Sequence, residues 1–129
     1  MRRLSILGST GSIGKQTLEV VRKAPGDFTV ESLTCGSDIN TLFDQIKEFR
    51  PKVCSVVDEN KAMELSKRLK DAGIDIEVLT GEEGNIACAS LDSSDTCVGA
   101  IVGFVMKEMK GKCDPAEANR MIAEQLKNL

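Results

Sequence analysis

Seven residues near the start of the chain, Gly8 to Gly14, carry glycines in the spacing G-x-x-G-x-x-G, which differs from the dinucleotide-binding G-x-G-x-x-G and gains its meaning from its position between a strand and a helix. Glycines at positions 8, 11 and 14 follow a short apolar run and precede an apolar helical pattern. The first N–H groups of a helix have no partner within the helix, and they lie at the positive end of its dipole. Glycine there removes the Cβ that would keep a pyrophosphate away from the backbone. This order of strand, glycine turn and helix predicts a nucleotide cofactor site, with a purely structural turn as the alternative.

The phosphate donors are expected to be backbone N–H and hydroxyl groups of the loop. The chain contains no histidine, so it lacks the commonest general base at neutral pH and the commonest metal ligand. No paired carboxylates, metal-ligand spacing or nucleophile–base pair stands out, so a binding function is visible and a catalytic one is not. The candidate phosphate-site residues are Gly8, Thr10, Gly11, Ser12, Ile13 and Gly14.

The residues after the second expected strand, Gly36, Ser37 and Asp38, fall where dinucleotide folds contact the adenine ribose. A carboxylate there would bind a ribose 2′-OH and favour NAD, whereas a basic residue would accept the 2′-phosphate of NADP. Ser37 can hydrogen-bond a phosphate, but no Lys or Arg lies between Thr34 and Asn40. Asp38 has a competing role as the N-cap of the next helix, and capping is the preferred interpretation.

An acid, three lysines and the cysteines could also carry chemistry, but a structural role is the favoured interpretation for each. Asp58 follows the third expected strand, where a site role competes with the favoured role of a solvated turn acid. The lysines Lys107, Lys110 and Lys112 form a basic cluster that is usual for a solvated helix face. Five cysteines with no C-x-x-C spacing are expected to be reduced and mostly buried.

Composition limits the function class. The 129 residues are 41% hydrophobic and 29% charged, as is normal for one globular domain. A net charge of −3 gives no global attraction to nucleic acid or an anionic membrane. No apolar run approaches the ~20 residues that span a bilayer, and residues 1–3 lead directly into an expected strand rather than a signal core. We therefore expect a cytoplasmic protein that does not associate with membranes.

Strand-like and helix-like segments alternate along the chain, which predicts βαβ units and a Rossmann-like, doubly wound parallel sheet of five strands. We expect Asn60 to cap the third helix and Gly73 to close it. The expected strands are Arg3–Leu7, Phe28–Thr34, Val53–Val57, Ile74–Leu79 and Cys97–Val102. The expected helices are Ser12–Lys23, Ile39–Phe49, a third ending before Gly73, and Glu82–Ala89.

The pattern changes after residue 103. A Met- and Lys-rich segment is followed by Gly111 and then by a helix start in which Asp114, Pro115 and Glu117 occupy the N-cap, N1 and N3 positions. We therefore divide the chain into a domain of residues 1–103 and a helical appendage of residues 104–129.

The opening of the chain, residues 4–22, reads LSILGSTGSIGKQTLEVVR and resembles the start of the 1-deoxy-D-xylulose 5-phosphate reductoisomerases, NADPH-dependent enzymes of the non-mevalonate isoprenoid pathway. The resemblance covers about four-fifths of the chain, and its opening motif is specific. It continues through Phe28–Val30, Cys35–Ser37, Pro51, Val57–Glu59, Val78–Gly81 and Ala100–Gly103.

The resemblance implies an NADPH-binding domain in which Thr10, Gly11, Ser12 and Ile13 hold the phosphates. Gly36 and Ser37 would lie by the ribose phosphate, where many members have a basic residue or Asn; here Ser37-Asp38 leaves NADH as an alternative cofactor. The cofactor cleft would be lined by Ala100, Ile101, Val102 and Gly103. The family's divalent-metal and substrate residues lie in a second half that has no counterpart in this sequence, so we expect cofactor binding without turnover.

The tail resembles a different family. From about residue 99 onward it is similar to the C-terminal helices with which the aspartyl/glutamyl-tRNA amidotransferases engage tRNA, on Val105-Met106-Lys107, the Lys-Gly-Lys of residues 110–112, Pro115 and Asn119. This implies tRNA-phosphate contacts by Lys107, Lys110 and Lys112. The chain would then be a chimera, with a tRNA-binding or assembly module as the alternative function.

A third hypothesis is a scaffold that has lost its ligand. An apolar sheet face left without its usual second domain would favour a homo-oligomer or a missing catalytic partner.

Overall fold

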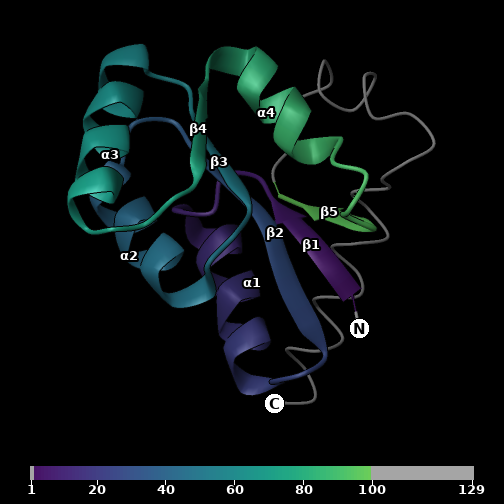
Figure 1. The fold of residues 1–129 in the computed structure, drawn as a ribbon. Helices are drawn as coiled ribbons and strands as arrows, with labels where there is room; N and C mark the ends of the chain where they lie inside the picture. Colours follow the sequence, from purple (N-terminus) through teal and green to yellow (C-terminus); the bar gives the residue numbers. More distant parts are fainter. Residues whose placement is uncertain (1, 100–129) are drawn as a thin grey trace.

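A computed structural model describes residues 2–99 of the chain, in which strands and helices alternate. All strand pairs are parallel, which confirms the predicted α/β architecture (Figure 1). The strands are β1 (Arg2–Ile6), β2 (Phe28–Cys35), β3 (Val53–Val56), β4 (Glu77–Thr80) and β5 (Thr96–Val98). The helices are α1 (Ser12–Lys23), α2 (Ile39–Phe49), α3 (Glu59–Asp71) and α4 (Gly81–Ala89).

The strand order is β4-β3-β2-β1-β5. The first three crossovers step across the sheet in one direction, and the fourth returns past all of them to place β5 beside β1. The switch point of this topology therefore lies between β1 and β5. In open parallel sheets ligands bind outside the carboxyl ends of the strands at this point, which is where the glycine loop follows β1.

The core has two layers because alternate strand residues face opposite sides of the sheet. Leu4 and Ile6 of β1 belong to the larger cluster, which packs against α1, α2 and α3. Leu7 belongs to a smaller cluster with Cys88 and Ala89 of α4. Figure 1 shows α4 on the side of the sheet opposite α1.

Serines allow α4 to approach the sheet closely. Ser5 of β1 and Ser32 of β2 both donate to the carbonyl oxygen of Cys88, at 2.8 and 3.0 Å. A Cβ at Gly84 would collide with the Ser55 hydroxyl and lie 3.2 Å from Ser55 Cβ. The small residues on both surfaces therefore set the spacing of this layer.

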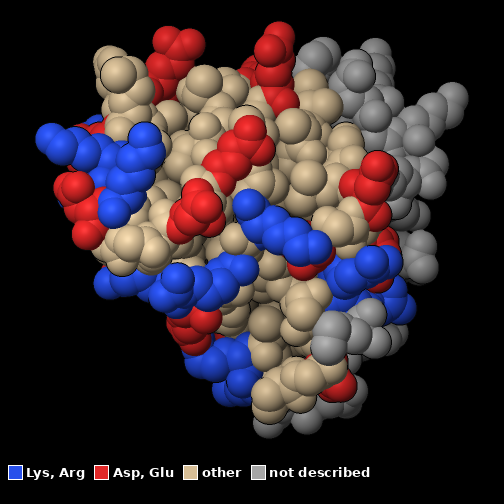
Figure 2. All heavy atoms as spheres, viewed as in Figure 1, with Lys and Arg blue, Asp and Glu red and all other residues tan. Residues whose placement is uncertain are grey.

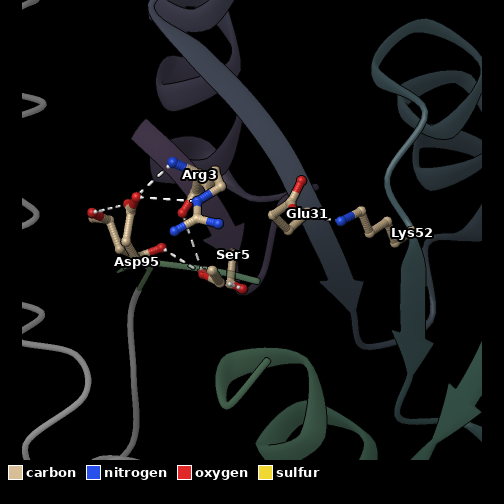
Figure 3. Close-up of polar contacts among 7 residues, drawn as sticks. Arg3, Ser5, Glu31, Lys52 and Asp95 are labelled. Carbon is tan, nitrogen blue, oxygen red and sulfur yellow. Dashed lines mark hydrogen bonds and ion pairs between the residues drawn. The ribbon is translucent and has the colours of Figure 1, made fainter. Parts of the chain in front are cut away.

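Polar contacts link β1 to the residue before β5, and β2 to the residue before β3 (Figure 3). The backbone N–H of Arg3 donates to Asp95 Oδ1 at 3.1 Å, and Asp95 returns a backbone bond to the Arg3 carbonyl at 2.9 Å. Glu31 pairs with Lys52 at 3.0 Å. The side chain of Glu31 is only 7% exposed. The register of β1 against β2 shifts between Leu4 and Ser5, next to this position.

The predicted N-cap of α3 and the predicted start of β4 were both wrong. Asp58, not Asn60, caps α3, because its Oδ1 accepts from the Lys61 N–H at 3.1 Å. At the other end, Gly73 adopts φ +73° as predicted, and the Ile74 N–H donates to the Leu69 carbonyl at 2.8 Å. This closing motif uses Ile74 as part of the helix end, so β4 starts three residues later than the expected strand.

The other expected elements agree with the structure to within a residue or so, including α4. The last strand is described from Thr96 to Val98, and the expected continuation to Val102 lies outside the described residues. The predicted boundary at residue 103 and the helical appendage also lie outside them. Within residues 2–99, no helix is long and apolar enough to cross a membrane.

Candidate functional site

The glycine loop turns sharply from β1 into α1. Gly8 adopts φ +66°, a left-handed conformation that favours glycine. The Gly11 N–H donates to the Gly8 carbonyl at 3.0 Å, and the Lys15 N–H donates to the Gly11 carbonyl at 2.9 Å. The loop is thus a closed turn that delivers the chain directly into the first turn of the helix.

The N-terminus of α1 is open, in contrast to those of α2 and α3. Its N-cap, Gly11, makes no side-chain capping bond, and no acidic residue occupies its first turn. Gly11, Ser12 and Ile13 are all exposed. Ile13 is 43% exposed and lies outside the core. Uncapped N–H groups with the positive dipole end form a site suited to an anion.

Gly14 has a packing function. It is buried, and a Cβ there would lie 2.6 Å from the Gly8 carbonyl oxygen and even closer to Ser9. Gly11 is different, since its Cβ would meet only the Gly8 oxygen at 3.4 Å. The candidate residue Gly14 therefore brings the helix against the loop rather than opening space for a ligand.

Buried hydrogen bonds to α2 and to the end of β2 fix the glycine loop in position. These contacts were not predicted from the sequence. The Ser9 hydroxyl donates to Gln45 Oε1 at 2.7 Å, and Gln45 Nε2 donates back to the Ser9 carbonyl at 2.8 Å. The Gly8 N–H donates to the Thr34 hydroxyl at 2.9 Å, and the Ser9 N–H donates to the Thr34 carbonyl at 2.8 Å. The signal that could have found them is Gln45, a polar residue on the apolar stripe of α2.

At the end of β2, Gly36, Ser37 and Asp38 are exposed at the same edge of the sheet as the glycine loop. Asp38 is the N-cap of α2, as preferred from the sequence: its two carboxylate oxygens accept from the N–H and the hydroxyl of Thr41, at 3.2 and 2.8 Å. These hydrogen bonds lower the pKa of Asp38, and the nearby positive charge of Lys15 lowers it further. Lys15 is a basic residue of the site that the sequence analysis did not single out.

The ends of β3 and β5 complete this edge. Val57 is 40% exposed, and Asp58, which we expected to be a solvated turn acid, serves as the helix cap described above. Gly99 has φ +148°, and its Cβ would lie 3.1 Å from the carbonyl carbon of Leu7. The chain therefore passes against the residue before the glycine loop. The predicted cleft residues Ala100, Ile101, Val102 and Gly103 follow directly but lie outside the described residues.

The cysteines of the described region are free and buried, as expected: Cys35, Cys54, Cys88 and Cys97. Burial raises the pKa of Cys35, Cys54 and Cys88 to about 12. Residues 2–99 also contain no group of three or more His, Cys, Asp or Glu side chains that could hold a metal ion.

Charges of both signs are interspersed on the face seen in Figure 2, where the described residues form no continuous basic band. Nucleic-acid binding by that face has no electrostatic support. Lys107, Lys110 and Lys112 lie outside the described residues.

A parallel sheet with helices on both faces and a glycine loop at the switch point defines a Rossmann-like α/β domain. The chain belongs to the 1-deoxy-D-xylulose 5-phosphate reductoisomerase family, whose model matches residues 4–123.

Individual relatives agree with this assignment. The chain is 49% identical to the 1-deoxy-D-xylulose 5-phosphate reductoisomerase of Lachnoclostridium phytofermentans, over 81% of this chain and 26% of the relative. It is 46% identical to that of Chlorobium phaeovibrioides, over 98% of this chain and 35% of the relative. A crystal structure of DOX-P reductoisomerase in complex with NADPH, fosmidomycin and magnesium matches with a TM-score of 0.79 at 32% identity, covering 99% of this chain and 34% of that one. The chain thus spans about a quarter to a third of the length of these proteins.

These comparisons give no support to the resemblance between the tail and the tRNA amidotransferases. The reductoisomerase family model runs on to residue 123 and takes in Lys107, Lys110 and Lys112. Identity to the Chlorobium phaeovibrioides relative likewise extends over almost the whole chain.

Proposed function

We propose that this chain supplies the NADPH-binding part of a 1-deoxy-D-xylulose 5-phosphate reductoisomerase. The observation that carries the proposal is the uncapped, exposed N-terminus of α1, which lies directly after the glycine turn at the switch point. An NADPH complex of a 32% identical relative supports the choice of ligand.

The geometry suggests how the contacts divide. The pyrophosphate would meet the backbone N–H groups of Gly11, Ser12 and Ile13 and the Thr10 hydroxyl. The adenosine ribose would lie toward Gly36 and Ser37, since β2 is the neighbour of β1 on that side. The nicotinamide half would extend toward β5 and the residues after Gly99, by the usual crossing of a dinucleotide over the switch point.

The reaction of the whole family is a further step of the same proposal. NADPH supplies a hydride when bound, and the acceptor must be held in position next to it. Residues 2–99 contain no group of three or more His, Cys, Asp or Glu side chains of the kind that could hold a divalent metal ion. We therefore assign no metal or substrate contact to them, and we place this chain's contribution at cofactor binding.

Compartment and partners belong to the proposal as well. Four buried free thiols suit a reducing compartment, which supports the cytoplasmic expectation. A nicotinamide dinucleotide is the proposed partner, and a catalytic domain or second copy is the expected protein partner. No specific observation favours tRNA binding or a division of the chain at residue 103.

Calorimetric titration of the 129-residue protein with NADPH and with NADH tests the function. We expect micromolar NADPH binding that is abolished by Gly11→Val, because the new side chain occupies the phosphate position while φ −83° at residue 11 remains allowed. Ala72→Val adds a comparable side chain at the exposed C-cap of α3, at the opposite edge of the sheet, and should leave binding unchanged. Absence of binding to either dinucleotide would overturn the proposal.

A further inference from the structure

Helices α1 and α2 lie side by side and run in the same direction, because each leads from the carboxyl end of one parallel strand to the start of the next. A contact near their C-terminal ends fixes their register. Arg22 binds Glu48 through two hydrogen bonds, of 2.6 and 2.8 Å, and its guanidinium lies 5.4 Å from the centre of the Phe49 ring.

The same register places Lys15 at the N-terminal end of α2. Lys15 precedes Arg22 by seven residues, and Thr41 precedes Glu48 by seven. Seven residues make about two helical turns, so Lys15 lies on the face of α1 that carries Arg22, at the level of Thr41. Thr41 is the residue that binds both oxygens of Asp38. The electrostatic effect of Lys15 on Asp38 agrees with this placement.

Asp38 already has a structural role. In NAD sites a carboxylate accepts a hydrogen bond from the ribose 2′-OH, whereas each oxygen of Asp38 accepts one bond from Thr41 and so caps α2, which leaves one acceptor site on each oxygen. Ser37, just before it, is exposed. Lys15 is also exposed, and no acid of residues 2–99 forms an ion pair with it within 4.0 Å.

We propose that Lys15 binds the 2′-phosphate of the dinucleotide, together with the Ser37 hydroxyl. The preference for NADPH over NADH would then come from the first turn of α1 and not from a basic residue in the loop after β2, where this chain has none. The proposal rests on the NADPH-binding function proposed above and names the residue that determines its specificity. An ammonium group next to a phosphate forms a charge-assisted hydrogen bond, which is stronger than one between neutral groups.

The neighbouring carboxylate of Asp38 should affect NADPH affinity in the opposite direction to Lys15. Asp38 places a negative charge near the same phosphate and lowers the gain from Lys15. Asp38→Asn keeps an acceptor for the Thr41 N–H while it removes the charge. This variant should bind NADPH more tightly than the wild type and leave NADH affinity within about twofold, since NADH has no phosphate at that position.

Titration of the wild type and of Lys15→Met with NADPH and NADH tests the proposal. The methionine keeps a long unbranched side chain but removes the charge. We expect NADPH affinity to fall about tenfold or more, the effect of losing one hydrogen bond to a charged group, with little change for NADH. Lys15→Arg should retain the NADPH preference. Lys23→Met removes the same charge from the last turn of α1 and serves as the matched control.

The possible results distinguish the role of Lys15 from the proposed NADPH-binding function. If Lys15→Met binds both dinucleotides as the wild type does, Lys15 has no part in binding while the NADPH function stands. If it weakens both equally with an unchanged thermal unfolding midpoint, Lys15 contacts the pyrophosphate and the specificity proposal is overturned. If the wild type binds neither dinucleotide, both proposals fail.

Discussion

At the residue scale, the glycines of one motif have different physical tasks. Gly8 provides a positive φ, Gly11 leaves the helix end accessible, and Gly14 allows the helix to touch the loop. Their spacing predicted a phosphate loop but not this division, because the task of each glycine depends on the backbone atoms that surround it.

Substitution by alanine separates these tasks. Gly14→Ala would force a methyl group into the backbone of Gly8 and Ser9, and we expect it to lower the free energy of unfolding by about 1–3 kcal/mol. Gly11→Ala has room for its methyl group, so it should change stability far less. Urea denaturation of the two variants against the wild type provides the measurement. Equal losses would show that the close approach at Gly14 does not contribute to stability.

Other residues show where sequence reasoning reaches its limit. Asp38 was predictable as a cap because a cap and its partner are three residues apart. Asn60 was predicted as the cap of α3, but Asp58 precedes the same apolar pattern, and the structure shows that Asp58 is the cap. Lys15 and Asp38 are brought together only by the packing of two helices, which no local pattern contains.

At the element scale, α2 supports the glycine loop through one buried side chain. Gln45 and Ser9 exchange two hydrogen bonds, so the glycine loop before α1 is tied to the middle of α2. The loop geometry is therefore expected to depend on a residue that touches no ligand.

We expect Gln45→Ala to cost about 1–3 kcal/mol of stability, since it leaves buried partners on Ser9 without their bonds. It should also weaken NADPH binding under conditions where the variant is fully folded, because the N–H groups of the loop lose their fixed position. Asp44→Ala changes the adjacent exposed residue of the same helix and should have little effect on either quantity. Calorimetry combined with circular dichroism distinguishes the two effects. NADPH affinity unchanged in folded Gln45→Ala would refute the positioning role.

The pairing of α1 with α2 has a predictable pH dependence. The hydrogen bonds from Arg22 lower the pKa of Glu48 below its ordinary value. A group whose pKa is lower in the folded state contributes stability above its unfolded pKa, about 4.3 for Glu, and loses it as the pH falls through the folded value. Both side chains are nearly half exposed, so the contribution should be about 0.2–1 kcal/mol.

The variant Glu48→Gln isolates this contribution. It should be less stable than the wild type at neutral pH, and the difference should shrink below about pH 4 as Glu48 of the wild type becomes protonated. Denaturant unfolding of both proteins across this range measures it. A difference that stays constant with pH would mean that packing, not charge, accounts for the effect of the substitution.

At the scale of the whole molecule, the alternation of apolar segments was sufficient to predict five parallel strands with helices between them. The strand order was not predictable in the same way, because residues 77–80 and 96–98 have similar apolar patterns yet lie at opposite edges of the sheet. The buried position of Glu31 likewise coincides with a register shift between two strands, which no local pattern contains. Contacts between distant segments decide such features.

The last prediction concerns turnover by the 129-residue chain without the rest of the reductoisomerase. We expect the 129-residue protein to bind NADPH without consuming it when 1-deoxy-D-xylulose 5-phosphate and magnesium are supplied. Hydride transfer requires an acceptor held next to the nicotinamide, and the described residues have no cluster suited to a metal ion that could hold one. The decrease of NADPH absorbance measures turnover, with a full-length relative assayed in the same mixture as the positive control. NADPH consumption that depends on the sugar phosphate and is lost in Gly11→Val would place catalytic residues within this chain and refute the expectation.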